Sequence, residues 1–474
     1  MKHRHYPLLA AAILLFSVPA CLGQTQFPDT PAGNQAKAWL EVFNAGDAVK
    51  HKEFLSKNAP TRLERADREM GLRERTGGFD VKKVEESTPT KIVALVQERT
   101  SDQFARFTIE VDAGEQHQIT RLALEGIARP AEFALPHLSE GELITELRKK
   151  LDEAATADRF SGAALVAKNG KTVFAQAYGL ADREKKTPNT LKTRFRLGSM
   201  NKMFTAVATL QLVQNGKLDL KAPFGNYLTD YPNKDVASKV TIEQLLSHTG
   251  GTGDIFGPEF DKNRLELKTL QDYVKLYGNR APEFAAGSRW QYSNYGFLLL
   301  GVLIEKVSGQ SYYDYVRDHI YKPAGMTGTA SEPEEQMVVD RSLGYTRFGG
   351  PILRPNTDTL PYRGTSAGGG YSTVEDLVKF AIALQTNKLL NAQYTEMLTT
   401  GKVDTPMGGK YAFGFQDSMI NGARCFGHGG GAPGMNGELK ICPAPGYVIA
   451  VLANTDPPAA SRVADFITNR LPMK

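Results

Sequence analysis

The apolar positions in the first part of the chain predict one helix followed by several strands. Trp39, Leu40 and Phe43 recur at helical spacing and would lie on the inner face of a helix over residues 36–43. Short runs rich in β-branched and aromatic residues predict strands at residues 91–97, 104–111 and 119–126. The pattern therefore predicts a small α+β domain over residues 27–135, with Pro130 and Pro136 marking its link to the rest of the chain.

From residue 138 the pattern becomes that of a larger sheet with helices around it. An amphipathic helix is expected over residues 138–156, and two strands, 161–168 and 172–179, flank the strong hairpin sequence Asn169-Gly170. A largely helical middle follows, in which Ser372-x-x-Glu375 indicates a capping box that opens a helix over residues 376–385. The last expected elements are strands at residues 425–428, 437–442 and 448–453 and a carboxy-terminal helix.

A hairpin, a helical insertion and returning strands together predict an α+β fold for residues 138–474. Its antiparallel sheet would have helices on both faces, and the insertion would form a separate all-α lobe. A functional site is expected between the sheet and the lobe, where clefts usually form.

Residues 1–23 have the organisation of a secretory signal peptide. Basic residues come first, and the apolar run over residues 8–20 is shorter than the roughly 20 residues that a membrane-spanning helix needs. Two processing routes stay open: cleavage after Gly23, or attachment of a lipid to Cys21 in the degenerate lipobox at residues 18–21. The protein is expected outside the cytoplasm, periplasmic or secreted, with membrane contact only through a lipid anchor at Cys21.

The composition is that of an ordinary folded protein. Of the 474 residues, 41% are hydrophobic and 23% are charged, and the formal net charge is +5. No dense block of lysine and arginine appears, so nucleic acid is not an expected partner. The eight histidines show no metal-ligand spacing, and neither a metal nor an organic cofactor is expected.

The stretch with the most chemical information is Ser199-Met200-Asn201-Lys202, which precedes an apolar helical run. Positions i and i+3 of a helix lie about one turn apart on one face, so the hydroxyl and the amine would point to the same place. A serine needs a neighbouring base to become a nucleophile, and a lysine is such a base only when its pKa is lowered. Taken alone, the pattern more often marks a helix start with a surface lysine.

Two further stretches follow in order, Tyr292-Ser293-Asn294 and His428-Gly429-Gly430-Gly431. Together with the phrases LLSHTGG at residues 245–251 and SAGGGYST at residues 366–373, they resemble the serine β-lactamase and penicillin-binding-protein superfamily. The resemblance is to its class C-related branch, which contains D-specific peptidases and family VIII esterases. It covers about residues 138–474 and implies the same fold that the pattern predicts.

The resemblance implies a role for each residue of the first two stretches. Ser199 would attack a carbonyl carbon, and Lys202 would hold the charge balance. Tyr292, either as a phenolate or as a proton relay, would pass the serine proton to the leaving group and later activate water. Asn294 would donate a hydrogen bond to Lys202 or to a substrate amide. Without the other motifs, Tyr292 would be interpreted as part of an aromatic cluster with Trp290.

In the third stretch, His428, Gly429, Gly430 and Gly431 are expected to form the end of an edge strand beside the nucleophile. Glycines let a substrate backbone approach closely, and the resemblance implies that the N–H groups of Gly431 and Ser199 bind an oxyanion. β-Lactamases have a lysine at the position of His428, and a histidine is mostly uncharged near neutral pH. This difference favours a peptidase, amidase or esterase over an efficient β-lactamase.

Two other motif-like stretches lack the context that they require. The pattern G-x-G-x-x-G at residues 429–434 is followed by a strand-like run and not by a helix, so it does not indicate a dinucleotide site. Gly170-Lys171-Thr172 lacks the upstream glycine of a phosphate-binding loop. His248 has no metal-binding partner in the sequence and is expected to be structural or to lie at the mouth of the cleft.

Cys425 and Cys442 lie on predicted neighbouring strands on either side of the His428 stretch. Export to an oxidising compartment would permit a disulfide between them. Two buried free thiols are the alternative, and the sequence does not decide between them.

The opening of the first domain resembles the small cone-shaped α+β domains of the NTF2-like group, through the stretch AWLEVFNAGD at residues 38–47. No catalytic constellation is visible in this domain. It is expected to be a packing or dimerisation module. In the second case the protein would form a homo-oligomer through this domain. A domain that binds substrate or cell-wall polymer is the alternative.

These features predict an extracytoplasmic serine hydrolase that acts through an acyl-enzyme on Ser199. The expected substrates are D-amino-acid peptides or amides, some derived from the cell wall, or short acyl esters, with β-lactams as slow substrates or covalent inhibitors. The alternative is a catalytically weak relative that binds peptidoglycan fragments or a protein partner. The intact Ser199 and Lys202 argue against that alternative.

Overall fold

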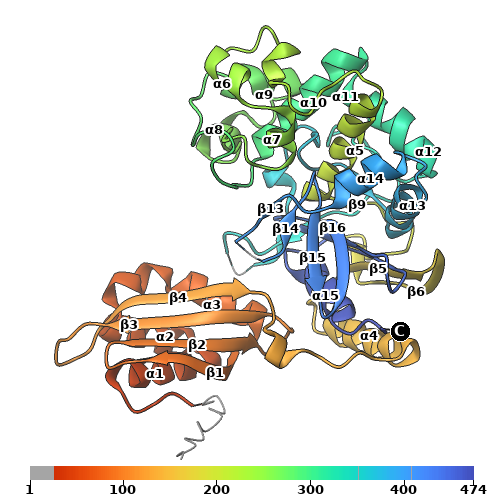
Figure 1. Cartoon of the computed structure of the whole chain (residues 1–474). Helices are drawn as coiled ribbons and strands as arrows, with labels where there is room; N and C mark the ends of the chain where they lie inside the picture. The colour runs from red at the N-terminus through yellow and green to blue at the C-terminus, as the bar shows by residue number, and fades with distance from the viewer. Residues whose placement is uncertain (1–25, 351, 407, 474) are drawn as a thin grey trace, which may run out of the picture. The chain divides into compact units, whose positions relative to one another are not determined.

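The computed structural model describes residues 26–350, 352–406 and 408–473, which divide into two compact units (Figure 1). Among these residues, 26–100 and 104–126 form the first unit, and 101–103 together with 127–473 form the second. The expected signal peptide, with Cys21 and Gly23, lies outside the described residues. None of the helices in the described ranges is long and apolar enough to cross a membrane.

In the first unit, helices lie on one face of a four-stranded antiparallel sheet (Figure 1). The helices are α1 (Pro31–Ala45), α2 (Ala48–Asn58) and α3 (Ala66–Thr76), and the strands, in sheet order, are β1 (Phe79–Ser87), β2 (Lys91–Glu98), β3 (Phe104–Val111) and β4 (Ile119–Ile127). Trp39, Leu40 and Phe43 are buried on α1, as their spacing predicts. The three predicted strands are confirmed as β2, β3 and β4. The sequence pattern missed β1, α2 and α3, in which charged residues are frequent.

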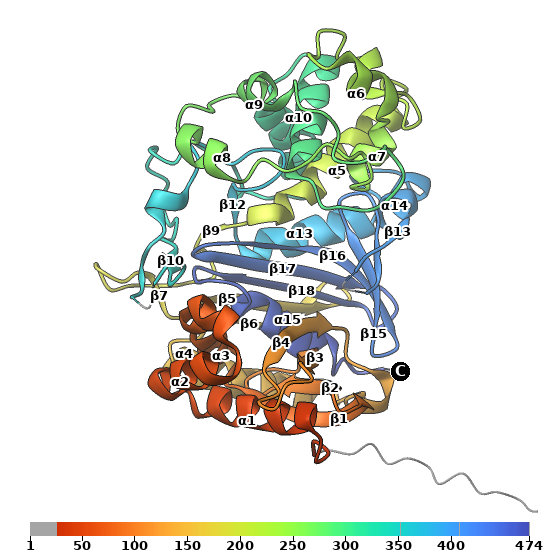
Figure 2. The same cartoon turned by 90° about the vertical axis from the view of Figure 1, so that its left-hand side faces the viewer.

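The second unit is built on an eight-stranded antiparallel sheet in the order β13-β14-β15-β16-β17-β18-β5-β6. Its strands are β5 (Gly162–Lys168), β6 (Lys171–Tyr178), β13 (Val403–Asp404), β14 (Lys410–Tyr411), β15 (Gln416–Ile420), β16 (Ala423–Ala432), β17 (Met435–Cys442) and β18 (Tyr447–Ala453). Helices α4 (Glu140–Thr156) and α15 (Ala459–Thr468) cover one face, and α5 (Asn201–Gln214) and α13 (Val374–Gln385) cover the other (Figure 2). The predicted antiparallel sheet with helices on both faces is therefore confirmed.

The residues of β18 form an uninterrupted apolar run, and the packing of this strand explains why. Val448, Ala450 and Leu452 belong to the core that includes α5 and α13. The alternate residues, including Ile449 and Val451, belong to the core beneath α4 and α15. A strand with both faces covered by helices buries every side chain, so it loses the alternation of a half-exposed strand.

An all-α lobe lies beside this sheet (Figure 2). It contains α6 (Lys234–Lys239), α7 (Ile242–Leu246), α8 (Pro258–Asn263), α9 (Leu270–Tyr277), α10 (Asn294–Ser308), α11 (Tyr312–Val316) and α12 (Lys322–Ala324). Its central helix is α10, which packs against α5, α7, α9 and α11 and is buried from Asn294 to Ile304. A helix that is apolar on all sides fits only at the centre of such a lobe.

The remaining short strands and α14 lie outside the eight-stranded sheet. They are β7 (Leu180–Asp182), β8 (Thr187–Pro188), β9 (Phe195–Arg196), β10 (Tyr345–Thr346), β11 (Arg354–Pro355), β12 (Tyr371–Ser372) and α14 (Ala392–Thr399). At the β5–β6 hairpin, Asn169 and Gly170 have φ angles of 47° and 77°, which confirms the predicted turn. The capping box was placed one residue too early, because α13 is capped by Thr373, whose side chain accepts from the Asp376 N–H, and not by Ser372.

Strand β16 is longer than predicted and changes its environment along its length. Its residues 423–427 pair with β15 on one side, and residues 426–432 pair with β17 on the other. Within the described residues, the second half of β16 therefore pairs on one side only. The expected edge strand is confirmed for this half, which contains His428 and the three glycines that follow it.

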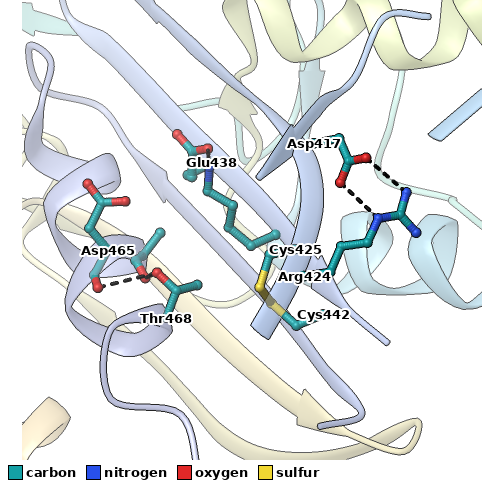
Figure 3. Close-up of a disulfide and its surroundings, with 9 residues drawn as sticks. Asp417, Arg424, Cys425, Glu438, Cys442, Asp465 and Thr468 are labelled. Atoms are coloured by element: carbon teal, nitrogen blue, oxygen red, sulfur yellow. Dashed lines mark hydrogen bonds and ion pairs between the residues drawn. A yellow bond between two sulfur atoms is a disulfide. The ribbon is translucent and has the colours of Figure 1, made fainter. Parts of the chain in front are cut away.

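The structure joins Cys425 of β16 to Cys442 of β17 in a disulfide, with a Cα–Cα distance of 4.2 Å (Figure 3). The pair lies next to the cross-strand pair Phe426 and Ile441, and both sulfur-bearing residues are buried in the core beneath α4 and α15. Of the two alternatives for these cysteines, the structure has the disulfide.

Removing this disulfide is expected to lower the free energy of unfolding by about 2–4 kcal/mol, because the crosslink closes a loop and restricts the unfolded chain. Urea unfolding of the oxidised wild type, the reduced wild type and the Cys425→Ala/Cys442→Ala variant measures the effect. The two forms without the crosslink should unfold at similarly reduced urea concentrations. Equal midpoints for the oxidised and reduced wild type would contradict the prediction.

Candidate active site

Ser199 and Lys202 lie at the start of α5, where a short 3-10 helix (Gly198–Met200) leads into the α-helix. Lys202 is fully buried, whereas Ser199 is partly exposed. The Lys202 Nζ atom lies 3.3 Å from the Ser199 Oγ atom. The i, i+3 spacing thus brings an accessible hydroxyl and a buried amine within contact of each other.

The Lys202 amine is surrounded by two oxygen acceptors and two aromatic rings. Its Nζ donates to Asn294 Oδ1 at 2.7 Å and to the carbonyl of Ala367. The ring centres of Tyr292 and Phe297 lie 4.7 and 5.5 Å from it. A neutral amine has two N–H donors and one lone pair. With Asn294 and Ala367 taking the two donors, the lone pair is left for the Ser199 hydroxyl.

Burial lowers the pKa of Lys202 to about 7, although the charge of Asp254 opposes the shift. Asp254 does not contact the lysine directly. It accepts from the Asn294 amide at 2.9 and 3.2 Å, and this orients the amide oxygen toward the amine. A substantial fraction of the lysine is therefore neutral near physiological pH.

Tyr292 and Asn294 reach the lysine because they flank the residue that caps α10. Ser293 is the N-cap, and its hydroxyl accepts from the Gly296 N–H at 2.9 Å. Its own N–H donates to His248 Nδ1 at 3.1 Å. The capping geometry fixes the turn at Ser293, so the residues before and after it both face Lys202.

Burial raises the pKa of Tyr292, and a hydrogen bond with the Ser199 side chain opposes this shift. The phenol is therefore protonated at neutral pH. Of the two states that the sequence left open for Tyr292, this environment favours the neutral phenol that exchanges protons over the stable phenolate.

His248 lies behind the site and not at its mouth. It is 1% exposed, and its ring centre lies 4.3 Å from that of Tyr292 and 4.5 Å from that of Tyr411. Burial, followed by the charges of Lys202 and His428, holds its pKa well below the usual value. A neutral ring that accepts from the Ser293 N–H serves to position the start of α10.

His428 is buried on β16 and hydrogen-bonded through both ring nitrogens. Its Nδ1 lies 2.5 Å from the Gly429 carbonyl oxygen, and its Nε2 lies 3.0 Å from the Tyr411 hydroxyl. A carbonyl can only accept, so Nδ1 carries the hydrogen and Nε2 accepts from Tyr411. Burial and the charge of Lys202 lower the pKa of His428 to about 3. The ring is neutral at physiological pH and supplies no positive charge for a substrate carboxylate.

The glycines of β16 let its backbone pack directly on the segment that holds the nucleophile. A Cβ atom on Gly430 would lie 1.9 Å from the Leu197 carbonyl oxygen. Gly198 has a φ angle of +54°, and a Cβ atom there would lie 2.9 Å from the Gly431 nitrogen. On the far face, a Cβ atom on Gly429 would meet the Glu438 carboxylate at 2.5 Å. Backbone therefore meets backbone at the nucleophile, which only glycine permits.

Three contributors to the site could not be identified from the sequence motifs. Asp254 orients Asn294, Tyr411 donates to His428, and Ala367 offers its carbonyl to Lys202. Ala367 belongs to the S-A-G-G-G phrase, so that phrase marked the right segment without showing which atom acts. In the same segment, the Gly369 N–H donates to the Gly198 carbonyl at 3.1 Å and so supports the nucleophile segment.

A profile of the beta-lactamase family matches residues 147–472. Among curated proteins, a penicillin-binding protein of Bacillus subtilis is 29% identical over 295 residues, which cover 58% of this chain and 64% of that protein. The chain therefore spans less than two thirds of the length of that relative. The family profile begins within the second unit, so the likeness of the first unit to NTF2-like domains stays a prediction.

Two solved structures extend the comparison. The penicillin binding protein from Bacillus halodurans is 30% identical with a TM-score of 0.61, and the match covers 69% of this chain and 98% of that chain. A D-stereospecific amidohydrolase from Streptomyces is 27% identical with a TM-score of 0.57, and the match again covers 69% of this chain and 98% of that chain. Both similarities agree with an antiparallel sheet flanked by helices.

Proposed function

Because the chain belongs to the beta-lactamase family, we propose that it is a serine hydrolase that forms an acyl-enzyme on Ser199. The observation that carries this proposal is the environment of Lys202. Its amine is buried, its pKa is about 7, and its hydrogen bonds to Asn294 and Ala367 leave the lone pair for Ser199 Oγ. A serine hydroxyl next to such a base is an activated nucleophile.

In the proposed acylation step, Ser199 Oγ bonds to the carbonyl carbon of the substrate and its proton passes to Lys202. The Tyr292 hydroxyl gives its proton to the departing nitrogen or oxygen and regains one from Lys202, so the bond to the leaving group breaks without a charged phenolate. The N–H groups of Ser199 and Gly431 would hold the oxyanion. In deacylation, water gives a proton to Tyr292 and attacks the acyl carbonyl carbon. Ser199 Oγ then leaves, regains its proton and releases the acid.

The neutral state of His428 affects which substrates the site would accept. Because His428 supplies no fixed positive charge at its position on β16, recognition of a carboxylate next to the scissile bond is weak, so β-lactams should acylate slowly. One matched structure is that of a D-stereospecific amidohydrolase. We therefore assign amides and peptides of D-amino acids, or short esters, as the substrate class, with the cell wall as their source outside the cytoplasm.

Intact-protein mass spectrometry tests the proposal. Wild-type protein would be exposed briefly to benzylpenicillin and, separately, to an activated ester, and hydrolysis of D-alanine and L-alanine p-nitroanilide would be compared. We expect an adduct on Ser199 and a preference for the D-anilide. Absence of both adducts and of all turnover would reject the proposal in favour of a catalytically weak binding protein.

The value of kcat/KM for the anilide is expected to rise with pH through about 7, because Lys202 accepts a proton only in its neutral form and its pKa is about 7. His428 and His248 do not account for such a rise, since their pKa values lie well below this range. A pH–rate profile between pH 5 and pH 9 measures the transition. A profile that falls or stays flat across this range would contradict the role of Lys202.

The Tyr292→Phe variant is expected to slow deacylation at least as much as acylation, by roughly 10²-fold, because it removes the group that exchanges protons with both leaving group and water. An acyl-enzyme should then accumulate and be visible by mass spectrometry. Tyr295→Phe is the matched control, since its hydroxyl contacts Tyr231 and not the candidate site. Normal turnover by Tyr292→Phe would exclude the proposed relay.

A further inference from the structure

A cavity lined mainly by helices of the all-α lobe lies apart from the candidate active site. It has a volume of about 480 Å³, and its walls come from α10, α11, the start of α9 and the segments around residues 330 and 363. None of the proposed catalytic residues lines it. Its size suits a small molecule, and its lining includes both aromatic side chains and charged groups.

Glu305 is the distinctive charged group of this cavity. One of its carboxylate oxygens accepts from the Tyr312 N–H at 3.0 Å. In the part of the chain that the structure describes, no basic group forms an ion pair with it. Burial raises its pKa, although the bond from Tyr312 opposes this shift. A partly buried carboxylate without a cation costs free energy, and a bound cation would relieve that cost.

The other basic groups of the cavity lining are either paired with acids or exposed. Lys268 is exposed, and its ammonium lies 5.4 Å from the ring centre of Tyr362. Arg317 pairs with Asp314 and Asp318. The Arg363 guanidinium lies 3.5 Å from the ring centre of Tyr313, and it also approaches Glu332 at 3.8 Å. An anionic ligand would therefore meet cations that are already paired or exposed to solvent and would face Glu305, whereas a cationic ligand would meet an available carboxylate.

Apart from these charged groups, the lining combines apolar and aromatic side chains with the hydroxyl residues Thr269, Ser311, Thr329 and Ser331. Leu270, Val316 and Ala330 contribute aliphatic surface, and Tyr312 and Tyr313 contribute rings. We propose that this cavity is a second ligand site, which takes a small organic ammonium compound with an aliphatic or aromatic body and transmits its occupancy to Lys202. Glu305 would bind the ammonium group, and the apolar walls would bury the body.

Occupancy of the cavity would be transmitted to Lys202 through the consecutive backbone carbonyls of residues 364–367. The Gly364 carbonyl accepts from the Tyr313 hydroxyl at 3.1 Å, at the cavity wall. The next three carbonyls accept from the helix of the nucleophile: Thr365 from Asn201 at 2.6 Å, Ser366 from Thr205 at 2.7 Å, and Ala367 from Lys202. Residues 363–367 therefore touch the cavity at one end and the lysine amine at the other.

A second contact runs in parallel. The Tyr312 hydroxyl lies 2.8 Å from Thr205 Oγ1 and 3.3 Å from the Asn201 amide nitrogen. A ligand that repositions Tyr312, Tyr313 or Arg363 would thus shift the carbonyl that orients the Lys202 amine. Coupling of this kind is reciprocal, so a change at Lys202 must alter ligand affinity by the same factor.

Calorimetric titration of the full-length protein with phenethylammonium tests the site. Wild type should bind phenethylammonium, and it should bind neither the neutral analogue 2-phenylethanol nor the anion 3-phenylpropionate with comparable affinity. Glu305→Gln should weaken phenethylammonium binding about tenfold or more, as expected for loss of a charge-assisted hydrogen bond. Glu266→Gln, an exposed acid outside the cavity lining, is the control and should leave binding unchanged. Equal binding of the three probes, or unchanged binding by Glu305→Gln, would overturn the site.

The transmission to Lys202 is tested by binding alone, so it does not depend on the proposed hydrolase function. Lys202→Met should change the affinity for phenethylammonium at least about threefold. Identical affinity in Lys202→Met and wild type would overturn the coupling. If Ser199 fails to form any adduct while these binding results hold, the proposed function is rejected and the second site stands.

Discussion

Replacing Ser199 by alanine is expected to abolish the acyl-enzyme and to lower turnover by a factor on the order of 10⁶, while the fold is retained. The Oγ atom is the only atom that the substitution removes, and it is the proposed nucleophile. Because Ser199 is partly exposed and packs little, its loss should change the free energy of unfolding by less than about 0.5 kcal/mol.

The measurement is intact mass after exposure to the activated ester, together with kcat/KM for the D-anilide. Ser139→Ala is a matched control, because Ser139 also starts a helix and caps α4. That variant should lose about 1 kcal/mol of stability through the lost cap and keep full acylation. An adduct of the same mass on Ser199→Ala would show that another residue is the nucleophile.

Replacing Lys202 by methionine is expected to lower the acylation rate by roughly 10²–10⁴-fold, the usual contribution of a positioned general base. Methionine keeps most of the length and apolar stem of lysine, so the variant removes the amine with little change in packing. The rise of kcat/KM with pH through about 7 should disappear at the same time, since its source is the Lys202 amine.

A second lysine, whose side chain is 13% exposed, provides the control. Lys440 of β17 lies 2.9 Å from the Glu438 carboxylate, and although burial alone would lower its pKa, the charges of Glu438 and Asp465 raise it. Lys440→Met should destabilise the protein, because it leaves buried carboxylates without their cation, yet acylation of the folded fraction should be normal. Equal loss of acylation in the two variants would mean that Lys202 acts through stability and not as a base.

The two lysines also show how far the sequence could predict the site. Ser199 and Lys202 are one helical turn apart, and Tyr292 and Asn294 flank the serine that caps α10. Helix geometry and cap geometry therefore bring the two side chains of each pair together. The pKa of Lys202 depends instead on which distant groups surround it. Asp254 and the Ala367 carbonyl come from segments far away in the chain, and a backbone carbonyl leaves no mark in the amino-acid sequence.

The same distinction applies to the fold. The hairpin at Asn169-Gly170 and the apolar strands at the end of the chain follow from local composition, and the superfamily resemblance inferred from the ordered motifs is confirmed by the match over residues 147–472. Strand β1 was missed because its side chains are mostly charged and its partner β2 supplies the buried surface. The cap of α13 was misplaced because Ser372 and Thr373 are both good caps, and only the backbone geometry distinguishes them.

The backbone packing of Gly198 and Gly430 has a consequence for how this protein can diversify. A methyl group at Gly430 would overlap the Leu197 carbonyl. Any side chain that arises by mutation at this position would therefore displace the segment that holds the nucleophile. Position 430 of the strand beside Ser199 is therefore closed to stepwise change of its side chain. New substrate preferences in descendants of this chain have to arise at other positions, where residues can be exchanged while the acylating centre stays intact.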